Sequence, residues 1–295
     1  MSLLGLFGAI AWRVNNGLFP VDTLVYWLAG HRLDIGHALY DLLPSDNMPL
    51  QANTRLTPLF SPPLIGVPWR ALAMLPGLSG MILWWGVLAA FGIGAAVRIL
   101  VATRGWGGLL LILLVPSYSL LIGVGNVDAF VLASLIGVWI ALDSGRYRAG
   151  GAIIGLLASL KLTPAVLIVW LITTKQWRAL RWALATCILL AIVTAVVIGP
   201  WIFTRYLRVM IAGTSSGQPG ALLVLMAGFI GLILLRRNNM ASFALAVLLM
   251  PLGSPQVAGH SWSMLLGSLA PLATRSLRPI ATHGGQIQAE KAPPL

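Results

Sequence analysis

The stretch that decides the fold runs from Gly150 to Leu180 and reads GGAIIGLLASLKLTPAVLIVWLITTKQWRAL. It is apolar along most of its length apart from Lys161, and it ends in a cluster of basic residues. An apolar run of this kind can cross the hydrocarbon core of a bilayer, which is about 30 Å thick. Basic residues that close such a run are typical of cytoplasmic loops. The stretch therefore predicts a membrane helix that is kinked after Lys161, because Pro164 interrupts its hydrogen bonding.

The composition extends this prediction to the whole chain. Of the 295 residues, 58% are hydrophobic and 9% are charged, and the mean hydropathy is +0.91. A soluble domain is about a quarter charged, so this chain lacks the polar residues to cover a water-facing surface. We predict an all-α integral membrane protein, a polytopic helical bundle of about ten spans. The expected spans lie near 3–19, 60–78, 80–98, 106–122, 127–142, 149–173, 178–200, 219–235, 240–252 and 260–274.

The remaining residues predict one external loop and one polar tail. Residues 20–59 carry most of the aspartates and form the most polar region before the tail, so we expect an external loop with short surface helices. Residues 276–295 have nothing to bury, and we expect them to be disordered. Residues 1–275 then form a single membrane domain.

The charge pattern excludes several classes of function. The net charge of +12 comes from basic residues in short loops, where they orient helices and meet anionic lipid rather than nucleic acid. Cys187 is the only cysteine, so no intrachain disulfide and no cysteine-rich metal site can form. No nucleotide-binding glycine motif or HExxH motif is present, so cytosolic nucleotide chemistry has no site in this sequence.

The orientation of the spans admits two solutions. Basic loops at 175–181, 236–237 and 275–278 predict cytoplasmic turns, and both solutions put the loop at 20–59 outside. A simple count of spans is preferred, although it leaves four arginines outside: Arg98, Arg104, Arg146 and Arg148. In the alternative, 60–78 is re-entrant and 149–173 folds into a helical hairpin at Lys161, which moves these arginines inside.

Asp22 is the first candidate for chemistry. A carboxylate at the boundary between membrane and water, beside Tyr26, can act as a general base on a hydroxyl group when it is partly desolvated. The alternative is a solvated aspartate that only marks a helix boundary.

Lys161 is costly within hydrocarbon, and such residues face a polar cavity or a partner. A phosphate is one anionic partner, while snorkelling to the interface or pairing with an acid are the alternatives. Asn126 and Asp128 lie between two expected spans, where they can contact a substrate or form a turn with a helix cap.

Three further polar residues lie in breaks between apolar runs. Gln256 and His260 fall in GSPQVAGHSW, from Gly253 to Trp262, and the histidine can hydrogen-bond a phosphate or a sugar, or orient a base. Arg55 precedes a double proline that stiffens entry into the next span. The alternative for the histidine is an incidental residue of the loop.

The segments taken in order resemble a known family. VDTLVYWLAGHRLDIGHALYD (21–41), LFSPPL (59–64), GVGNVDAFVLASLIGVWIAL (123–142), the opening stretch and GSPQVAGHSW are similar to successive motifs of glycosyltransferase family 87. This family comprises membrane mannosyltransferases of the GT-C superfold, which use a polyprenyl-phosphate sugar. The resemblance covers roughly residues 20 to 275. The chain departs from the family pattern at Asn126, where glutamine is usual, at Asp128, where asparagine is usual, and at Ser61, where tyrosine is usual.

The resemblance implies a reaction and a location. Asp22 would be the general base of an inverting sugar transfer. It would activate an acceptor hydroxyl at the outer face of the cytoplasmic (plasma) membrane. The residues implied to bind substrates are Tyr26, Lys161, His260, Arg55, Gln256, Asn126 and Asp128. The implied partners are the lipid bilayer, a polyprenyl-phosphate sugar donor and a lipid or glycan acceptor, with no nucleic acid, cofactor or metal.

Two other functions fit the same residues. A transporter or flippase of a lipid-linked solute would use the broken 149–173 helix and Lys161 as a site at the middle of the membrane. It would have little need of an external loop rich in aspartate. A non-catalytic relative that binds another membrane protein would tolerate the loss of Asp22.

Overall fold

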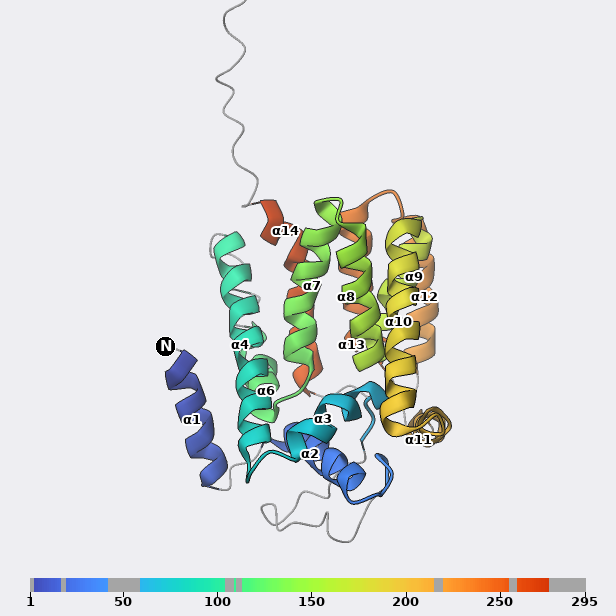
Figure 1. Ribbon diagram of the computed structural model, residues 1–295. Coiled ribbons are helices and arrows are strands. Elements are labelled where there is room, and N and C mark those ends of the chain that lie inside the picture. The colour runs from blue at the N-terminus through green and yellow to red at the C-terminus, as the bar shows by residue number, and fades with distance from the viewer. Residues whose placement is uncertain are drawn as a thin grey trace, which may run out of the picture.

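The computed structural model describes residues 3–16, 20–41, 59–103, 109, 113–214, 220–254 and 259–275. Within these ranges every regular element is helical, which agrees with the all-α prediction (Figure 1). Residues 42–58 of the expected external loop and the expected tail, residues 276–295, lie outside the described residues.

The α-helices, in chain order, are α1 (Leu3–Asn15), α2 (Val21–Asp34), α3 (Gly66–Ala73), α4 (Ser79–Ala102), α6 (Val115–Val124), α7 (Asp128–Asp143), α8 (Tyr147–Leu160), α9 (Val166–Thr173), α10 (Trp177–Ile198), α11 (Ile202–Thr214), α12 (Ala221–Leu234), α13 (Asn239–Leu252) and α14 (Ala270–Arg275). Short 3-10 helices adjoin them: η2 (Pro63–Ile65), η3 (Thr163–Ala165) and the longer η4 (Gly259–Leu269).

Helix α7 forms the centre of the bundle. Its side chains are buried on several faces, where they meet α4, α8, η4 and α14. A helix that is apolar all round is buried either among other elements or in a membrane, and α7 is covered by other elements. Near its end Trp139 packs on Phe243 with ring centroids 5.1 Å apart, and Phe243 in turn packs on Trp170 at 5.2 Å. These rings tie α7 to α13 and α9.

Helices α8 and α10 run parallel and approach closely. A Cβ atom on Gly151 would lie 2.2 Å from the Ala179 carbonyl oxygen, and one on Gly155 would lie 2.4 Å from that of Ala183. Small residues four apart on both helices allow this contact between backbones, as in many membrane helix pairs. Because α8 and α10 are parallel neighbours, α9, which lies between them in the sequence, must run antiparallel to both.

The prediction of one kinked span at 149–173 is therefore wrong, and the alternative helical hairpin at Lys161 is what the structure contains (Figure 1). Lys161 has an extended backbone, with φ −147° and ψ 138°, and ends α8. Pro164 then stands at the start of η3, where a proline fits because the first turn of a helix has no hydrogen-bond partner for its nitrogen.

The expected span at 60–78 is also not formed. Its residues make only η2 and the short α3, which packs against α2 through the contact of Gly30 with the Trp69 carbonyl. The first long helix of this region, α4, begins at Ser79. Proline and glycine residues interrupt the apolar run, so its hydropathy does not translate into one continuous helix.

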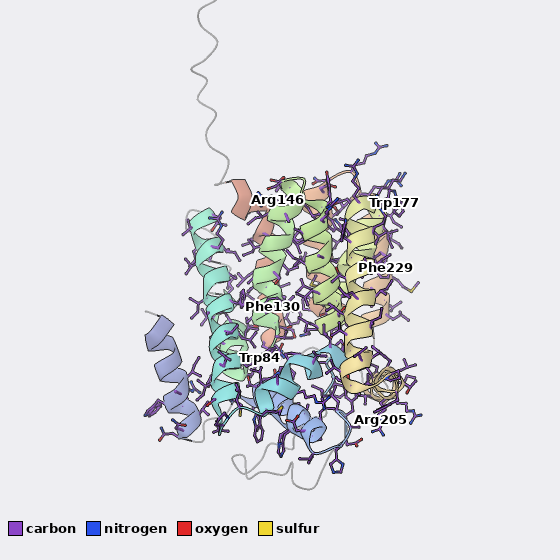
Figure 2. The ribbon with its side chains drawn as sticks, viewed as in Figure 1. Trp84, Phe130, Arg146, Trp177, Arg205 and Phe229 are labelled. Atoms are coloured by element: carbon purple, nitrogen blue, oxygen red, sulfur yellow. The ribbon has the colours of Figure 1, made fainter. Side chains whose placement is uncertain are left out.

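Basic turns gather at one end of the bundle, which we call the basic end. Asp143, Gln176 and Arg237 line one cavity there, so the α7–α8, α9–α10 and α12–α13 turns lie together. Figure 2 shows Arg146 and Trp177 at this end and Arg205 near the other. The basic residues in or next to these turns are Arg146, Arg148, Lys175, Arg178, Arg181, Arg236 and Arg237. Arg98, near the end of α4, lies toward the same end, whereas Arg104 lies outside the described residues. We call the opposite end, which carries α2 and α3, the α2 end.

Two described helices, α4 with 24 residues and α10 with 22, are long and apolar enough to cross a bilayer by themselves. Helices α6 and α7 would qualify together, but they meet at 113°. The apolar helices α8, α12 and α13 have 14 residues each, which corresponds to about 21 Å. The count of about ten spans therefore stays a prediction.

Candidate active site

Polar side chains from separate parts of the chain meet at the α2 end. They come from the start of α2, the turn between α6 and α7, the end of α8 and the start of η4. We call this group the polar cluster; it consists of Asp22, Asn126, Asp128, Lys161, His260 and Ser261. The sequence singled out all of these except Ser261, and the structure brings them together.

Asn126 joins the two aspartates. Its Nδ2 donates to Asp22 Oδ2 at 2.7 Å, and its Oδ1 accepts from the backbone N–H of Asp128 at 2.8 Å. The turn that carries Asn126 depends on Gly125, whose φ of +63° is left-handed. A Cβ at Gly125 would also lie 2.1 Å from Thr23 Oγ1, which donates to the Gly125 carbonyl. Local geometry thus fixes the amide against the carboxylate.

Asp128 is the most buried member, with no exposed surface. Its Oδ1 forms an ion pair with Lys161 Nζ, and its Oδ2 lies 3.5 Å from both His260 Nε2 and Ser261 Oγ. A buried carboxylate requires such partners, because leaving it unpaired would cost several kcal/mol. Of the alternatives for Lys161, the structure therefore shows pairing with an acid. Asp128 also begins α7, where its charge suits the positive end of the helix dipole.

Asp22 is half-buried at the start of α2. Burial raises the pKa of its carboxyl above the ordinary value of 3.8, and the charge of Asp128 adds to the rise. The hydrogen bond from Asn126 and the charges of His260 and Lys161 oppose this shift. A carboxylate whose pKa is raised, but which still ionises at neutral pH, is a stronger general base than a solvated one.

Tyr26 lies one turn after Asp22 but points into the core. Its ring is 3% exposed and packs on Trp69 and Trp84, with centroids 6.2 and 6.1 Å away. Burial, and then the charge of Asp22, raise the pKa of its hydroxyl. The ring therefore anchors α2 beneath Asp22, and a direct contact with substrate stays a prediction.

Two predicted substrate contacts, Arg55 and Gln256, lie outside the described residues. Sequence reasoning missed Thr23 and Ser261, which each stand beside a residue that it selected. Their hydrogen bonds join positions 102 and 133 residues apart, so local spacing could not reveal them. Within the described ranges, no three His, Cys, Asp or Glu side chains gather as metal ligands would.

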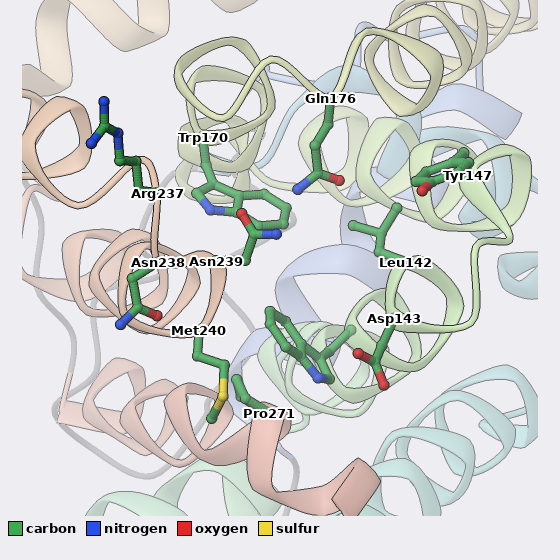
Figure 3. A pocket seen from close by; sticks show the side chains of 11 residues that line it. Leu142, Asp143, Tyr147, Trp170, Gln176, Arg237, Asn238, Asn239, Met240 and Pro271 are labelled. Carbon is green, nitrogen blue, oxygen red and sulfur yellow. The ribbon is translucent and has the colours of Figure 1, made fainter.

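A cavity of about 590 Å³ lies at the basic end and is separate from the polar cluster (Figure 3). Its lining includes Trp139, Trp170, Asp143 and Gln176. Asp143 ends α7 and Asp128 begins it, so the cavity and the cluster are about 22 Å apart along this helix. The cavity is therefore not part of the candidate active site.

Comparisons with known proteins identify the family of the chain. The sequence model of glycosyltransferase family 87 matches residues 60–220, which is more than half of the chain. A polyprenol-phosphate-mannose-dependent alpha-(1-2)-phosphatidylinositol pentamannoside mannosyltransferase of Mycolicibacterium smegmatis (strain ATCC 700084 / mc(2)155) is 26% identical over 188 residues. That alignment covers 61% of this chain and 44% of the relative, so the chain spans less than half of the relative's length. No solved structure matches the chain.

Proposed function

Because the chain belongs to glycosyltransferase family 87, we propose that it transfers mannose from a polyprenyl-phosphate donor to a hydroxyl group of a lipid or glycan acceptor. The polyprenol-phosphate-mannose dependence of the mycobacterial relative supports this choice of donor. Asp22 is the general base of this reaction. The observation that carries the proposal is the half-buried Asp22 carboxylate, held by Asn126 within a cluster that also contains a lysine and a histidine.

The transfer needs one proton acceptor and one leaving group. Asp22 takes the proton of the acceptor hydroxyl as its oxygen forms a bond to the anomeric carbon of the sugar. The bond between that carbon and the phosphate oxygen breaks, and its electron pair leaves with polyprenyl phosphate. Attack from the face opposite to the leaving group inverts the anomeric configuration. His260 can hydrogen-bond the phosphate oxygen that gains charge, which lowers the barrier electrostatically.

The distribution of charge supports an extracytoplasmic site. Cytoplasmic loops of membrane proteins carry an excess of Lys and Arg, and in the described residues more of them lie at the basic end than at the α2 end, which carries Arg32, Arg70, Arg205 and Arg208. The polar cluster lies at the opposite end, so this orientation exposes Asp22 to the outer face. The hairpin at Lys161 accounts for three of the arginines that conflicted with the simple count, Arg98, Arg146 and Arg148, and Arg104 lies outside the described residues.

The transporter alternative loses its main support. It required Lys161 at the middle of a single broken span, but the residue ends α8 at the α2 end and pairs with Asp128. The described hairpin therefore puts no lysine halfway across the bundle.

Replacing Asp22 by asparagine tests the proposal. Membranes containing Asp22→Asn, supplied with radiolabelled polyprenyl-phosphate mannose and lipid extract, should transfer about 10²–10⁴-fold less sugar than the wild type. Asp34→Asn is the matched control, because Asp34 is exposed at the other end of the same helix. This variant should transfer sugar at the wild-type rate. Transfer by Asp22→Asn at the wild-type rate would exclude the proposed base.

The thermal stability of Asp22→Asn shows whether a loss of activity comes from lost chemistry or from unfolding. Because the native environment raises the pKa of Asp22, the ionised carboxyl opposes folding at neutral pH. Asparagine preserves the shape without the charge, so Asp22→Asn should unfold at the same temperature as the wild type or higher. Thermal unfolding of the purified protein in detergent measures this.

A further inference from the structure

The polar cluster contains fewer free positive charges than its residues suggest. Lys161 is the one lysine of the cluster, and its ammonium is paired with the fully buried carboxylate of Asp128. The charged and titratable groups that face this pair are Asp22 and Tyr26 on α2 and His260 on η4. The paired ammonium of Lys161 therefore adds no unpaired positive charge to the cluster.

The proposed reaction changes the charge of the phosphate. A sugar phosphodiester carries one negative charge. After the carbon–oxygen bond breaks, the product is a phosphate monoester, which carries about −1.5 to −2 at neutral pH. A site that offers an unpaired lysine would therefore hold the product more tightly than the donor, and release of product would become slow.

We propose that Asp128 is a positioning residue that balances the charge of Lys161 and thereby keeps the site from retaining the phosphate monoester product. This inference rests on the proposed function. Asp128 acts through Lys161 and His260 and, being without exposed surface, does not touch the substrate itself. The side chain of Lys161 remains 22% exposed, so its ammonium could reach a phosphate if Asp128 did not hold its charge.

A simpler role for Lys161 would be to bind the donor phosphate directly. In that case the ion pair would have to break whenever substrate binds, and a buried carboxylate would lose its main partner. Breaking a buried pair in this way is costly. Keeping the pair intact leaves His260 as the ring N–H group of the cluster that can donate a hydrogen bond to phosphate.

Direct binding of two simple ligands tests the inference without any turnover. The ligands are dodecyl phosphate, a monoester, and methyl dodecyl phosphate, a diester, and binding to the purified full-length protein in detergent is measured by calorimetry at neutral pH. Asp128→Asn keeps the side-chain shape but releases the charge of Lys161. We expect the Kd of the monoester to fall about tenfold and that of the diester about threefold, since the gain scales with ligand charge.

Asp143→Asn is the matched control for net charge. It removes the same charge from the far end of α7, about 22 Å away, which exceeds the screening length of about 10 Å in ordinary buffer. Neither affinity should change in this variant. The double variant Asp128→Asn/Lys161→Met removes the ion pair together and should bind both ligands with wild-type affinity.

The results separate three cases. Equal or weaker monoester binding by Asp128→Asn would overturn the inference, even if the wild-type protein transfers mannose. The predicted change in the ratio of the two affinities would support it, even if Asp22→Asn showed that the proposed base is wrong. If Asp128→Asn does not fold, the double variant is measured alone. A tenfold loss of monoester affinity in the double variant would show that Lys161 binds phosphate while it is paired with Asp128, and this would overturn the inference.

Discussion

The side-chain amide of Asn126 donates a 2.7 Å hydrogen bond to the carboxylate of Asp22, although 104 residues separate them in the chain. The same amide accepts a hydrogen bond from the backbone of Asp128. One side chain therefore sets both the direction of the candidate base and its distance from the buried ion pair. Asp22 owes its orientation to the turn before α7 as much as to its own helix.

Removing the Asn126 amide should shift the pH dependence of transfer. Asp22 must be ionised to accept a proton, so activity falls as the pH drops through its pKa, which already lies above 3.8. The Asn126 hydrogen bond lowers that pKa, so Asn126→Ala should raise it and move the acidic limb of kcat/KM to higher pH. We also expect about a tenfold lower rate above the limb, because the base is no longer oriented.

Asn239→Ala serves as the control for this experiment, because Asn239 presents an amide at the basic end. Its pH profile should match that of the wild type. An acidic limb that stays at the same pH in Asn126→Ala would mean that Asp22 is not the group whose ionisation limits the reaction.

The sequence contained the members of the site but not the path of the chain. Polar residues in or between apolar runs are costly unless they pair with one another or face a polar cavity. This cost is why the sequence could indicate Asp22, Asn126, Asp128, Lys161 and His260. Hydropathy records how apolar a run is, but not whether the chain reverses within it. The run at 149–173 therefore read as one span, although the break at Lys161 turns it into a hairpin.

Small residues in the sequence are a second signal for the hairpin. Gly151 and Gly155 stand four residues apart, as do Ala179 and Ala183, and each pair allows a close helix contact. A match between these pairs makes α8 and α10 parallel neighbours, which requires a return segment between them in the chain. The burial of Asp128 and the partners of Lys161 still depend on contacts across the bundle that no local pattern encodes.

Enlarging Gly155 should destabilise the bundle. An added Cβ would lie 2.4 Å from the Ala183 carbonyl oxygen, so Gly155→Ala forces α8 and α10 apart. Overpacking of this kind costs about 1–3 kcal/mol. Thermal unfolding in detergent should show a lower midpoint for Gly155→Ala than for the wild type.

Gly94→Ala in α4 is the matched control, since nothing lies within 4 Å of its added Cβ. There the midpoint should stay the same or rise slightly, because alanine restricts the unfolded chain and favours a helix. Equal midpoints for Gly155→Ala and Gly94→Ala would contradict the close packing of α8 on α10.

The orientation of the bundle can be tested with single cysteines. Cys187 is the only cysteine, so Cys187→Ala provides a background without thiols. In that background, His37→Cys marks the α2 end and Ser144→Cys marks the turn between α7 and α8 at the basic end, and both positions are exposed. If the basic end faces the cytoplasm, a membrane-impermeant maleimide should label position 37 in intact cells and position 144 only after permeabilisation. The reverse pattern would put the polar cluster on the cytoplasmic side, and the donor sugar would then have to be presented there.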